Sequence, residues 1–476
     1  MRSSRRAIVV GSGPNGLAGA IRLAQADHKV TIYEAQPTIG GGLRSLPLTE
    51  PGFIHDLCAT VLPLALASPF LGRLPLRRYG VAWVQPPAPL AHPFDDGTAI
   101  VLERSPWRTA SALGVDGDAY LRLMEPLVRD APMLIPALLG PLRPLRHPSL
   151  ARFGVLALLS AKALAWRTFH TTRARALFAG LAAHSFLPLD SPISAAFGLV
   201  LGMLAHAVGW PIVRGGAQRL ADALVSLLYD LGGSVVPSRE IRSLATLPSA
   251  DAYLLDIDPG QAASIAGERF SAGFQAKLRR HRYGPAAFKI DYALAGSIPW
   301  RAEACRRAGT IHIGGSFEDI AASERAANEG KVAERPFVLL AQPSQFDPTR
   351  APVGMQAVWA YCHVPFGSTA DMTDRIEAQI ERFAPGFRDR IITRSVANPA
   401  RLQALNANEV GGAINGGAQD LTAMLRQATA LPSPYVTTDP AIYLCSASTP
   451  PGGGVHGMCG FHAAQAALRH RQRDDL

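Results

Sequence analysis

The chain has 476 residues, of which 48% are hydrophobic and 18% are charged, so it is too long for one small module and too apolar for a disordered protein. Its 47 basic and 37 acidic residues give a formal net charge of +10, but the basic side chains are scattered rather than set in a stripe, which argues against nucleic-acid binding. The cysteines are odd in number and far apart, which argues against a disulfide scaffold and a dithiol active site; they are Cys58, Cys305, Cys362, Cys445 and Cys459.

The N-terminal segment predicts a βαβ unit that binds a dinucleotide. Residues 7–10 are a short β-branched run typical of a buried strand, residues 11–16 form a glycine-rich turn, and residues 17–25 carry apolar side chains at helical spacing. A second strand is predicted over residues 30–33, and it ends at Glu34. The first apolar run is too short for a signal peptide, so we expect a cytoplasmic location.

Residues 85–211 predict a helical insertion. Apolar segments punctuated by proline and arginine, such as residues 153–166 and 193–210, have helical character. The stretch 191–213 has no Asp, Glu, Lys or Arg and is long enough to span a bilayer. Its glycines, its two prolines and His206 favour instead a helix that lines an apolar pocket.

The nucleotide-binding domain resumes after this insertion and also closes the chain. A helix is predicted over residues 217–231, followed by strands over 234–237 and 252–256. Near the C-terminus, a strand over 443–445 and a helix over 457–469 flank a glycine turn. One domain is therefore predicted to be built from distant parts of the chain.

The other residues predict a second domain. Residues 269–400 mix strands, such as 338–342 and 356–363, with a helix over 373–383. The prediction is an α/β protein with a discontinuous Rossmann-type nucleotide-binding domain and an inserted α+β substrate domain, whose helical part is a candidate membrane-facing surface. The nucleotide-binding domain comprises residues 1–84, 212–268 and 401–476, and the substrate domain comprises residues 85–211 and 269–400.

The first turn carries the G-x-G-x-x-G pattern at Gly11, Gly13 and Gly16. The first glycine permits a tight turn, the second lets backbone amides approach a pyrophosphate, and the third lets the helix pack closely on the strand. Glu34 follows 18 positions after Gly16, where its carboxylate can accept hydrogen bonds from ribose hydroxyls. The same carboxylate would repel a 2′-phosphate.

A second glycine run, residues 39–44, favours FAD over a nicotinamide cofactor. Its backbone amides can meet the second phosphate, and Arg44 can lie along the flavin. A nicotinamide domain would need its own G-x-G-x-x-G turn, and the sequence has no second one. A third turn, residues 446–457, places glycines at a helix start, whose positive potential can stabilise negative charge on a reduced flavin.

Six segments resemble the phytoene desaturase-like branch of FAD-dependent oxidoreductases, and in particular proteins of the kind called pyridine nucleotide-disulfide oxidoreductase domain-containing protein 2. They are VVGSGPNGLAGAIRLA at 9–24, GGGLRS at 40–45, WPIVRGGAQRLADAL at 210–224, GGSVVP at 232–237, NEVGGAINGGAQDL at 408–421 and YLCSASTPPGGGVHGMCG at 443–460. The resemblance covers nearly the whole chain and implies a noncovalently bound FAD. The missing cysteine pair argues against disulfide chemistry despite that name.

The resemblance and the three turns together predict the residues that hold FAD. These are Gly11, Gly13, Pro14, Asn15, Gly16, Glu34, Ala35, Gly41, Gly42, Arg44, Val236, Ser448, Gly453, Gly454 and Val455. Ser448 stands where many flavoproteins of the wider class carry an acidic residue near the ribityl chain. His55, Asn415 and His456 are the catalytic candidates, although a structural or supporting role is favoured over proton transfer for each of them. No metal site is predicted.

We therefore predict an FAD-dependent oxidoreductase that desaturates or saturates a carbon–carbon bond of a hydrophobic, isoprenoid-like or long-chain substrate by hydride transfer with flavin N5. Two alternatives stay open: a redox-neutral flavin-dependent isomerase or hydratase, and a noncatalytic FAD-bearing scaffold protein. The expected electron acceptor is a quinone or oxygen.

A basic stretch between residues 134 and 175 contains no Asp or Glu. It is consistent with two interpretations: peripheral binding to the inner face of an anionic membrane, or a solvated basic face over a buried core. Its basic residues are Arg143, Arg146, Arg152, Lys162, Arg167, Arg173 and Arg175.

Overall fold

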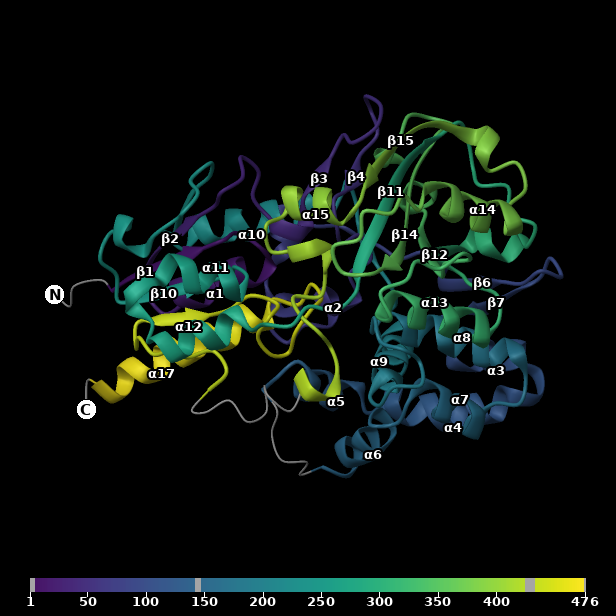
Figure 1. The fold of residues 1–476 in the computed structure, drawn as a ribbon, viewed down its shortest axis with the longest axis horizontal. Coiled ribbons are helices and arrows are strands. Elements are labelled where there is room, and N and C mark those ends of the chain that lie inside the picture. Colours follow the sequence, from purple (N-terminus) through teal and green to yellow (C-terminus); the bar gives the residue numbers. More distant parts are fainter. Residues whose placement is uncertain (1–4, 142–146, 424–432, 475–476) are drawn as a thin grey trace.

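The computed structural model describes residues 5–141, 147–423 and 433–474. Figure 1 shows an elongated molecule with two lobes. One lobe is built around a parallel sheet, and the other around a larger sheet with a layer of helices beneath it in this view.

The first sheet is parallel and has the order β16-β10-β1-β2-β9. Its strands are β1 (Arg6–Val10), β2 (Lys29–Tyr33), β9 (Ser234–Val236), β10 (Ala252–Leu255) and β16 (Ile442–Leu444). Parallel strands need long crossover connections, so strands that are far apart in the sequence become neighbours. All five strands come from the segments 1–84, 212–268 and 401–476 that the sequence assigns to the nucleotide-binding domain.

Helices cover both faces of this sheet. One face carries α1 (Pro14–Ala24), α10 (Gln218–Asp230) and α17 (Met458–Asp474), and the other carries α11 (Pro259–Ala266) and α12 (Ala272–Arg279). Successive side chains of a strand point to opposite faces, so Ala7 and Val9 join the first of these cores while Ile8 and Val10 join the second.

The second sheet is mixed, with the order β15-β11-β14-β13-β12-β6-β7, and only the β12–β6 pair is parallel. Its strands are β6 (Ala88–Pro93), β7 (Ala99–Leu102), β11 (Ala286–Leu294), β12 (Ala308–Ile313), β13 (Val338–Ala341), β14 (Gln356–Val364) and β15 (Ile391–Ala397). One of its faces packs on α14 (Thr373–Phe383) through an apolar core. The other face lies toward α8 and α13.

A layer of helices forms the lower part of the second lobe (Figure 1). It contains α3 (Pro106–Ala112), α4 (Gly117–Arg129), α5 (Ala131–Leu138), α6 (Pro148–Ala157), α7 (Ala161–Thr168), α8 (Thr172–Ala183), α9 (Ser194–Ala207) and α13 (Phe317–Asn328). The remaining α-helices and strands of the described residues are α2 (Pro63–Ala67), α15 (Pro399–Leu405), β3 (Ser45–Leu46), β4 (His55–Asp56), β5 (Trp83–Val84) and β8 (Ile212–Val213).

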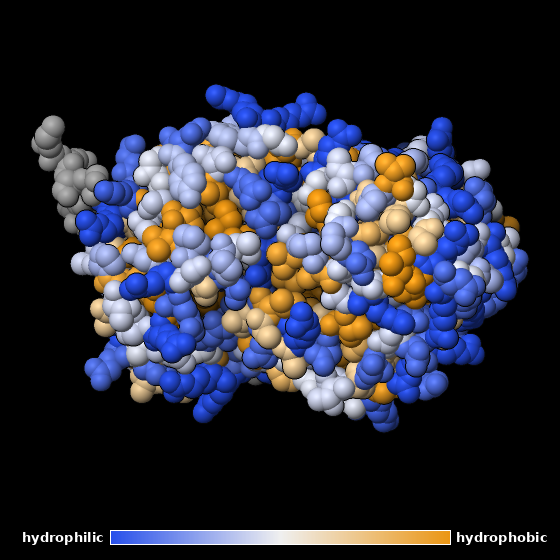
Figure 2. Space-filling view, turned by 90° about the horizontal axis from the view of Figure 1, so that it is seen from above, coloured by the Kyte–Doolittle hydropathy of each residue, from blue (hydrophilic) through white to orange (hydrophobic). Residues whose placement is uncertain are grey.

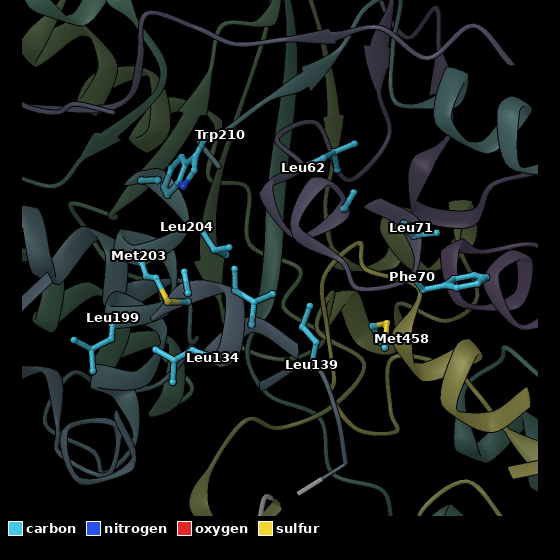
Figure 3. Packing of buried hydrophobic residues seen from close by; sticks show 14 of the residues in the cluster. Leu62, Phe70, Leu71, Leu134, Leu139, Leu199, Met203, Leu204, Trp210 and Met458 are labelled. Atoms are coloured by element: carbon cyan, nitrogen blue, oxygen red, sulfur yellow. The ribbon is translucent and has the colours of Figure 1, made fainter. Parts of the chain in front are cut away.

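One apolar core connects the helical layer to the nucleotide-binding domain. Figure 3 shows Met203 and Leu204 of α9 on one side of it, and Leu62, Phe70 and Met458 on the other. The two lobes therefore share buried contacts rather than a flexible linker.

Most of the predicted elements are confirmed, and α14 has the bounds predicted for its helix. The helical character predicted for residues 153–166 is confirmed, but the chain breaks there into two helices, α6 and α7. The Ser160 side chain caps α7 by accepting a hydrogen bond from the amide of Ala163 at 3.1 Å. Among the described helices, none is by itself long and apolar enough to cross a membrane; α6 and α7 reach that length only as a pair, which bends by 106°.

Candidate functional site

The first glycine turn connects β1 to α1 and is closely packed. Gly11 has a φ of +98°, and a Cβ on Gly13 would lie 2.6 Å from Oδ2 of Asp256. Gly13 is the N-cap of α1, has no side chain to cap the helix, and is followed by Pro14 in the first turn. The helix N-terminus therefore presents backbone N–H groups and positive potential, as a phosphate site requires.

Glu34 directly follows β2 and is held by three hydrogen bonds. The amide and the hydroxyl of Ser12 donate to Oε2 at 2.9 and 2.6 Å, and the amide of Gln36 donates to Oε1 at 2.9 Å. These bonds fix the carboxylate beside the turn, where a ribose would be bound.

The second glycine run touches the first. A Cβ on Gly41 would lie 2.9 Å from Cα of Gly13, so only glycine allows this approach. Arg44 is buried, and its Nε donates to the carbonyl of Gly41 at 3.0 Å while a second guanidinium nitrogen donates to the carbonyl of Leu405. Burial lowers the pKa of Arg44, and the negative charges of Glu34 and Glu409 oppose that shift.

Asp256 was not predicted to be a site residue, but it lies at the centre of the cradle. It follows β10, is buried, and its Oδ2 accepts a hydrogen bond from the amide of Gly16 at 2.7 Å. Burial raises its pKa to about 7, and the charge of Glu34 adds to this shift. One feature of the sequence could have identified Asp256: it is the last residue of a predicted strand. In the structure this strand, β10, pairs with β1, and ligands of such sheets bind at the carboxyl ends of the strands.

A cavity of about 1640 Å³ begins at these turns and extends into the second lobe. Many of the predicted site residues line it, namely Gly11, Gly13, Pro14, Asn15, Glu34, Ala35, Gly41, Gly42, Arg44, Asn415, Ser448, Gly454 and Val455. Gly16, Val236, Gly453, His55 and His456 are not among its lining residues. Figure 2 shows apolar side chains gathered in the middle of the face seen from above, between hydrophilic ends.

His55 and Asp56 lie behind the cavity wall. His55 is buried, shares a hydrogen bond of 2.7 Å with Thr49, and has its pKa lowered to about 3, first by burial and then by the charge of Lys289. Asp56 forms a buried ion pair with Arg350 at 2.9 Å. The Asp56–Arg350 pair connects β4 to the second lobe, and His55 beside it does not line the cavity.

His456 is fully buried in the third turn. Its Nε2 faces the carbonyl of Gly452 at 3.1 Å, and its Nδ1 accepts a hydrogen bond from the amide of Met458 at 3.0 Å. Burial lowers its pKa to about 4. Both ring nitrogens contact backbone groups of the third turn, so His456 stabilises this turn. Asn415 remains as the catalytic candidate that lines the cavity.

Glu409 and Cys58 are cavity-lining groups that sequence reasoning did not select. Burial raises the pKa of Glu409 to about 7, opposed by hydrogen bonds from Cys58 and Asn406. The distance from the Asn406 amide to Oε1 of Glu409 is 3.1 Å. Glu409 lies within the NEVGG segment at 408–412, which is part of the family resemblance. The Glu409 carboxylate itself is not among the predicted site residues. A carboxyl group with this pKa can hold or accept a proton near neutral pH.

An aromatic wall lines the cavity beyond the glycine turns. Trp359 and Tyr361 are two positions apart on β14 and lie on the same face of the sheet. Both line the cavity, and their rings are stacked with centroids 5.6 Å apart. The indole of Trp359 donates to the hydroxyl of Thr60 at 2.6 Å, which fixes its ring. Trp210 and Leu201 line the cavity from the second lobe, as expected for a pocket lined by the stretch 191–213. No group of three or more metal-ligating side chains occurs among the described residues.

Residues 9–71 match the family described as NAD(P)-binding Rossmann-like domain. Over 97% of its length the chain is 24% identical to pyridine nucleotide-disulfide oxidoreductase domain-containing protein 2 of Mus musculus, covering 93% of that protein. It is also 24% identical to a phytoene desaturase (lycopene-forming) of Pantoea ananas, with 97% of this chain and 98% of that protein covered.

Solved structures share the fold over the full length of the chain. An oxidoreductase from Methanosarcina mazei superposes with a TM-score of 0.67 at 17% identity, covering 98% of this chain and all of that one. Putrescine oxidase bound to putrescine superposes with a TM-score of 0.62 at 15% identity, covering 99% of both chains.

The Rossmann-type sheet, its glycine cradle and the mixed sheet beside them define a two-domain oxidoreductase with a dinucleotide-binding site. Relatives of both kinds match over nearly the whole chain. The chain is a distant relative, over nearly its whole length, of the phytoene desaturase-like FAD-dependent oxidoreductases.

Proposed function

We propose that the protein binds one FAD noncovalently and uses it to desaturate or saturate a carbon–carbon bond of a hydrophobic, isoprenoid-like or long-chain substrate. The observation that carries this proposal is the continuity of one cavity from the glycine cradle to the aromatic wall. Its volume of about 1640 Å³ exceeds the range of roughly 300–1,000 Å³ for common ligand pockets, which leaves room for a second molecule beside a dinucleotide.

The residues of the cradle fit FAD. The space left by the missing side chains of Gly13 and Gly41 adjoins the N-terminus of α1, where a diphosphate would accept backbone hydrogen bonds. Glu34 would accept hydrogen bonds from the ribose, and the guanidinium of Arg44 lies beyond the second turn. Val236 and Gly453, which are outside the cavity wall, would support these turns rather than contact FAD.

When bound, FAD supplies the centre that exchanges a hydride with carbon. The chain's own residues would bind and orient the substrate: Trp359, Tyr361 and Trp210 bury apolar surface and exclude water from the cavity. Glu409 is positioned to hold or accept the proton that accompanies the hydride, because its side chain is buried in the wall next to Cys58.

The relatives support an apolar substrate, since several are named phytoene desaturases. The test is anaerobic incubation of the FAD-loaded protein with phytoene, squalene or geranylgeraniol in detergent, with products identified by mass spectrometry. A product that differs by two hydrogens, formed as the flavin changes oxidation state, supports the proposal.

Three other results would contradict it. A product of unchanged mass with an unchanged flavin spectrum would indicate the isomerase, and a hydrated product with an unchanged flavin spectrum would indicate the hydratase. Absence of turnover with every apolar compound and with added quinone or oxygen would favour the noncatalytic scaffold. A Gly13→Val variant that lacks FAD serves as the control for turnover without flavin.

We also propose that α6 and α7 rest on an anionic membrane surface. Val155 and Leu158 are 68% and 54% exposed on this segment, and Arg152 lies beside them in α6. Several members of the basic stretch make contacts within the protein. Arg152 donates to the carbonyl of Arg122 at 3.0 Å, Arg173 pairs with Asp96 at 2.7 Å, and the guanidinium of Arg175 lies 4.4 Å from the ring of Trp166. Arg143 and Arg146 lie outside the described residues.

A further inference from the structure

The part of the cavity farthest from the glycine turns lies between the second sheet and α8 and α9. Leu201, Trp210 and Leu339 give it apolar walls, and His184 and Thr310 line it as well. Successive side chains of β12 point to opposite faces of the sheet. Ile311 and Ile313 pack into the core on one face, so Thr310 and His312 point to the other face, toward the helices.

Two polar groups here have no hydrogen-bond partner in the described part of the chain. The first is Oγ1 of Thr310, a residue that is 4% exposed. The second is Nδ1 of His312, which is fully buried. The backbone of Gly180 in α8 packs against this nitrogen, since a Cβ there would lie 2.5 Å from it. Buried polar groups without partners are rare in folded proteins, so the Thr310 hydroxyl is a group that a ligand in the cavity would satisfy.

The tautomer of His184 follows from its neighbour. The Nε2 atoms of His184 and His312 lie 3.0 Å apart and share one hydrogen. A hydrogen on Nδ1 of His312 would be a buried donor without an acceptor, so His312 carries its hydrogen on Nε2 and donates to His184. Burial lowers the pKa of both rings, that of His184 to about 3. His184 is therefore neutral, carries its own hydrogen on Nδ1, and has a donor left for a ligand in the cavity.

We propose that this end of the cavity binds a neutral oxygen-bearing end group of the substrate, a hydroxyl or a carbonyl, with His184 as hydrogen-bond donor and Thr310 as its second partner. The inference rests on the proposed function and narrows its substrate class from a plain hydrocarbon to a long apolar chain with one polar end. A hydrocarbon would leave the Thr310 hydroxyl unsatisfied, which is unfavourable in a buried site.

A charged end group does not fit. No lysine or arginine lines this end of the cavity in the described residues, and the two histidines are neutral. A carboxylate would be buried there without a counter-charge, which proteins avoid. An alcohol can accept from His184 and donate to Thr310, and a ketone or aldehyde can accept from both.

The test compares three ligands of equal chain length: hexadecan-1-ol, hexadecane and palmitate. Each is supplied from methyl-β-cyclodextrin to the FAD-loaded protein, and the bound lipid is quantified by gas chromatography after gel filtration. The wild type is expected to bind the alcohol about tenfold more tightly than the alkane, as for one buried hydrogen bond, and to bind palmitate no better than the alkane.

Substitutions assign the preference to residues. Thr310→Val and His184→Phe should reduce the affinity for the alcohol to that for the alkane, while Thr310→Ser should retain the preference because it keeps the hydroxyl. His170→Phe makes the same exchange at an exposed histidine that does not line the cavity and should behave as the wild type. Flavin content and near-ultraviolet circular dichroism confirm that each variant is folded.

Each outcome is decisive. Equal affinities for alcohol and alkane in the wild type would overturn the inference and indicate that water satisfies these groups, while leaving an apolar substrate site intact. A preference that survives both Thr310→Val and His184→Phe would also overturn it. Failure to bind any of the long-chain ligands would instead count against the proposed function itself.

Discussion

At the scale of single residues, Asp256 places a carboxyl group against the glycine cradle that would hold a diphosphate. Its Oδ2 accepts from the amide of Gly16, and its pKa is raised to about 7 from a usual value of 3.8. The folded apoprotein therefore takes up a proton that the unfolded chain has released, and its stability falls as the pH rises from about 4 to about 7. Above pH 7 the carboxylate would repel the phosphates of FAD.

The first prediction is that FAD affinity decreases with rising pH and that Asp256→Asn removes this dependence. If FAD binds only the neutral form of Asp256, the dissociation constant of the wild type should be about tenfold higher at pH 8 than at pH 6. Titration of the apoprotein followed by flavin fluorescence measures this directly. An equal pH dependence in wild type and variant would show that Asp256 stays ionised or lies away from the phosphates.

The second prediction is that the purified protein carries one FAD per chain and that Gly13→Val abolishes binding. The added side chain would start 2.6 Å from Asp256 and would fill the space that a pyrophosphate needs. Absorbance at 450 nm after incubation with FAD reports the outcome. Gly273→Ala in α12 is the matched control, because its Cβ would meet no atom within 4 Å. A yellow Gly13→Val variant would place the cofactor elsewhere.

At the scale of elements, the pair α6 and α7 carries exposed apolar side chains, Val155 and Leu158 among them. The third prediction is that cosedimentation with vesicles is stronger for anionic than for neutral lipid, because each basic side chain near an anionic surface contributes about 1 kcal/mol. Replacing both Val155 and Leu158 with Glu should reduce the bound fraction several-fold. Val353→Glu alters an exposed loop before β14 and should leave it unchanged. Equal binding to neutral vesicles would remove the proposal.

At the scale of the whole molecule, the described residues contain one nucleotide cradle. The other glycine pairs serve packing: Gly232 and Gly233 end α10 through bonds to its last carbonyls, and Gly216 lies against Ser45. Gly314 lies against Ile320 in the same way.

The fourth prediction is therefore that NADH and NADPH reduce the bound flavin slowly, and that electrons reach a quinone, oxygen or another carrier. Anaerobic stopped-flow mixing of the oxidised protein with either nucleotide tests it. Bleaching at the rate of turnover would reveal a nicotinamide site that the fold does not indicate, whereas slow bleaching agrees with acceptor-dependent turnover.

The sequence alone determined the features that depend on neighbouring residues. Glycine spacing, β-branched runs and helical periodicity are local, so the βαβ start, the two glycine turns at Gly13 and Gly41, and the helix over 373–383 could be predicted from it. The same local signals identified Glu34, because the end of a strand fixes where the next side chain points.

The tertiary structure decided which distant residues meet. Asp256 reaches the cradle because β10 pairs with β1 across more than 240 residues, and no local pattern encodes that pairing. His55 and His456 were catalytic candidates for which the sequence favoured a structural role, and packing engages their rings away from the cavity. Glu409 and Thr310 line the cavity instead. Long-range strand pairing and burial, which depend on the whole chain closing around one core, set these positions and the pKa values that follow from them.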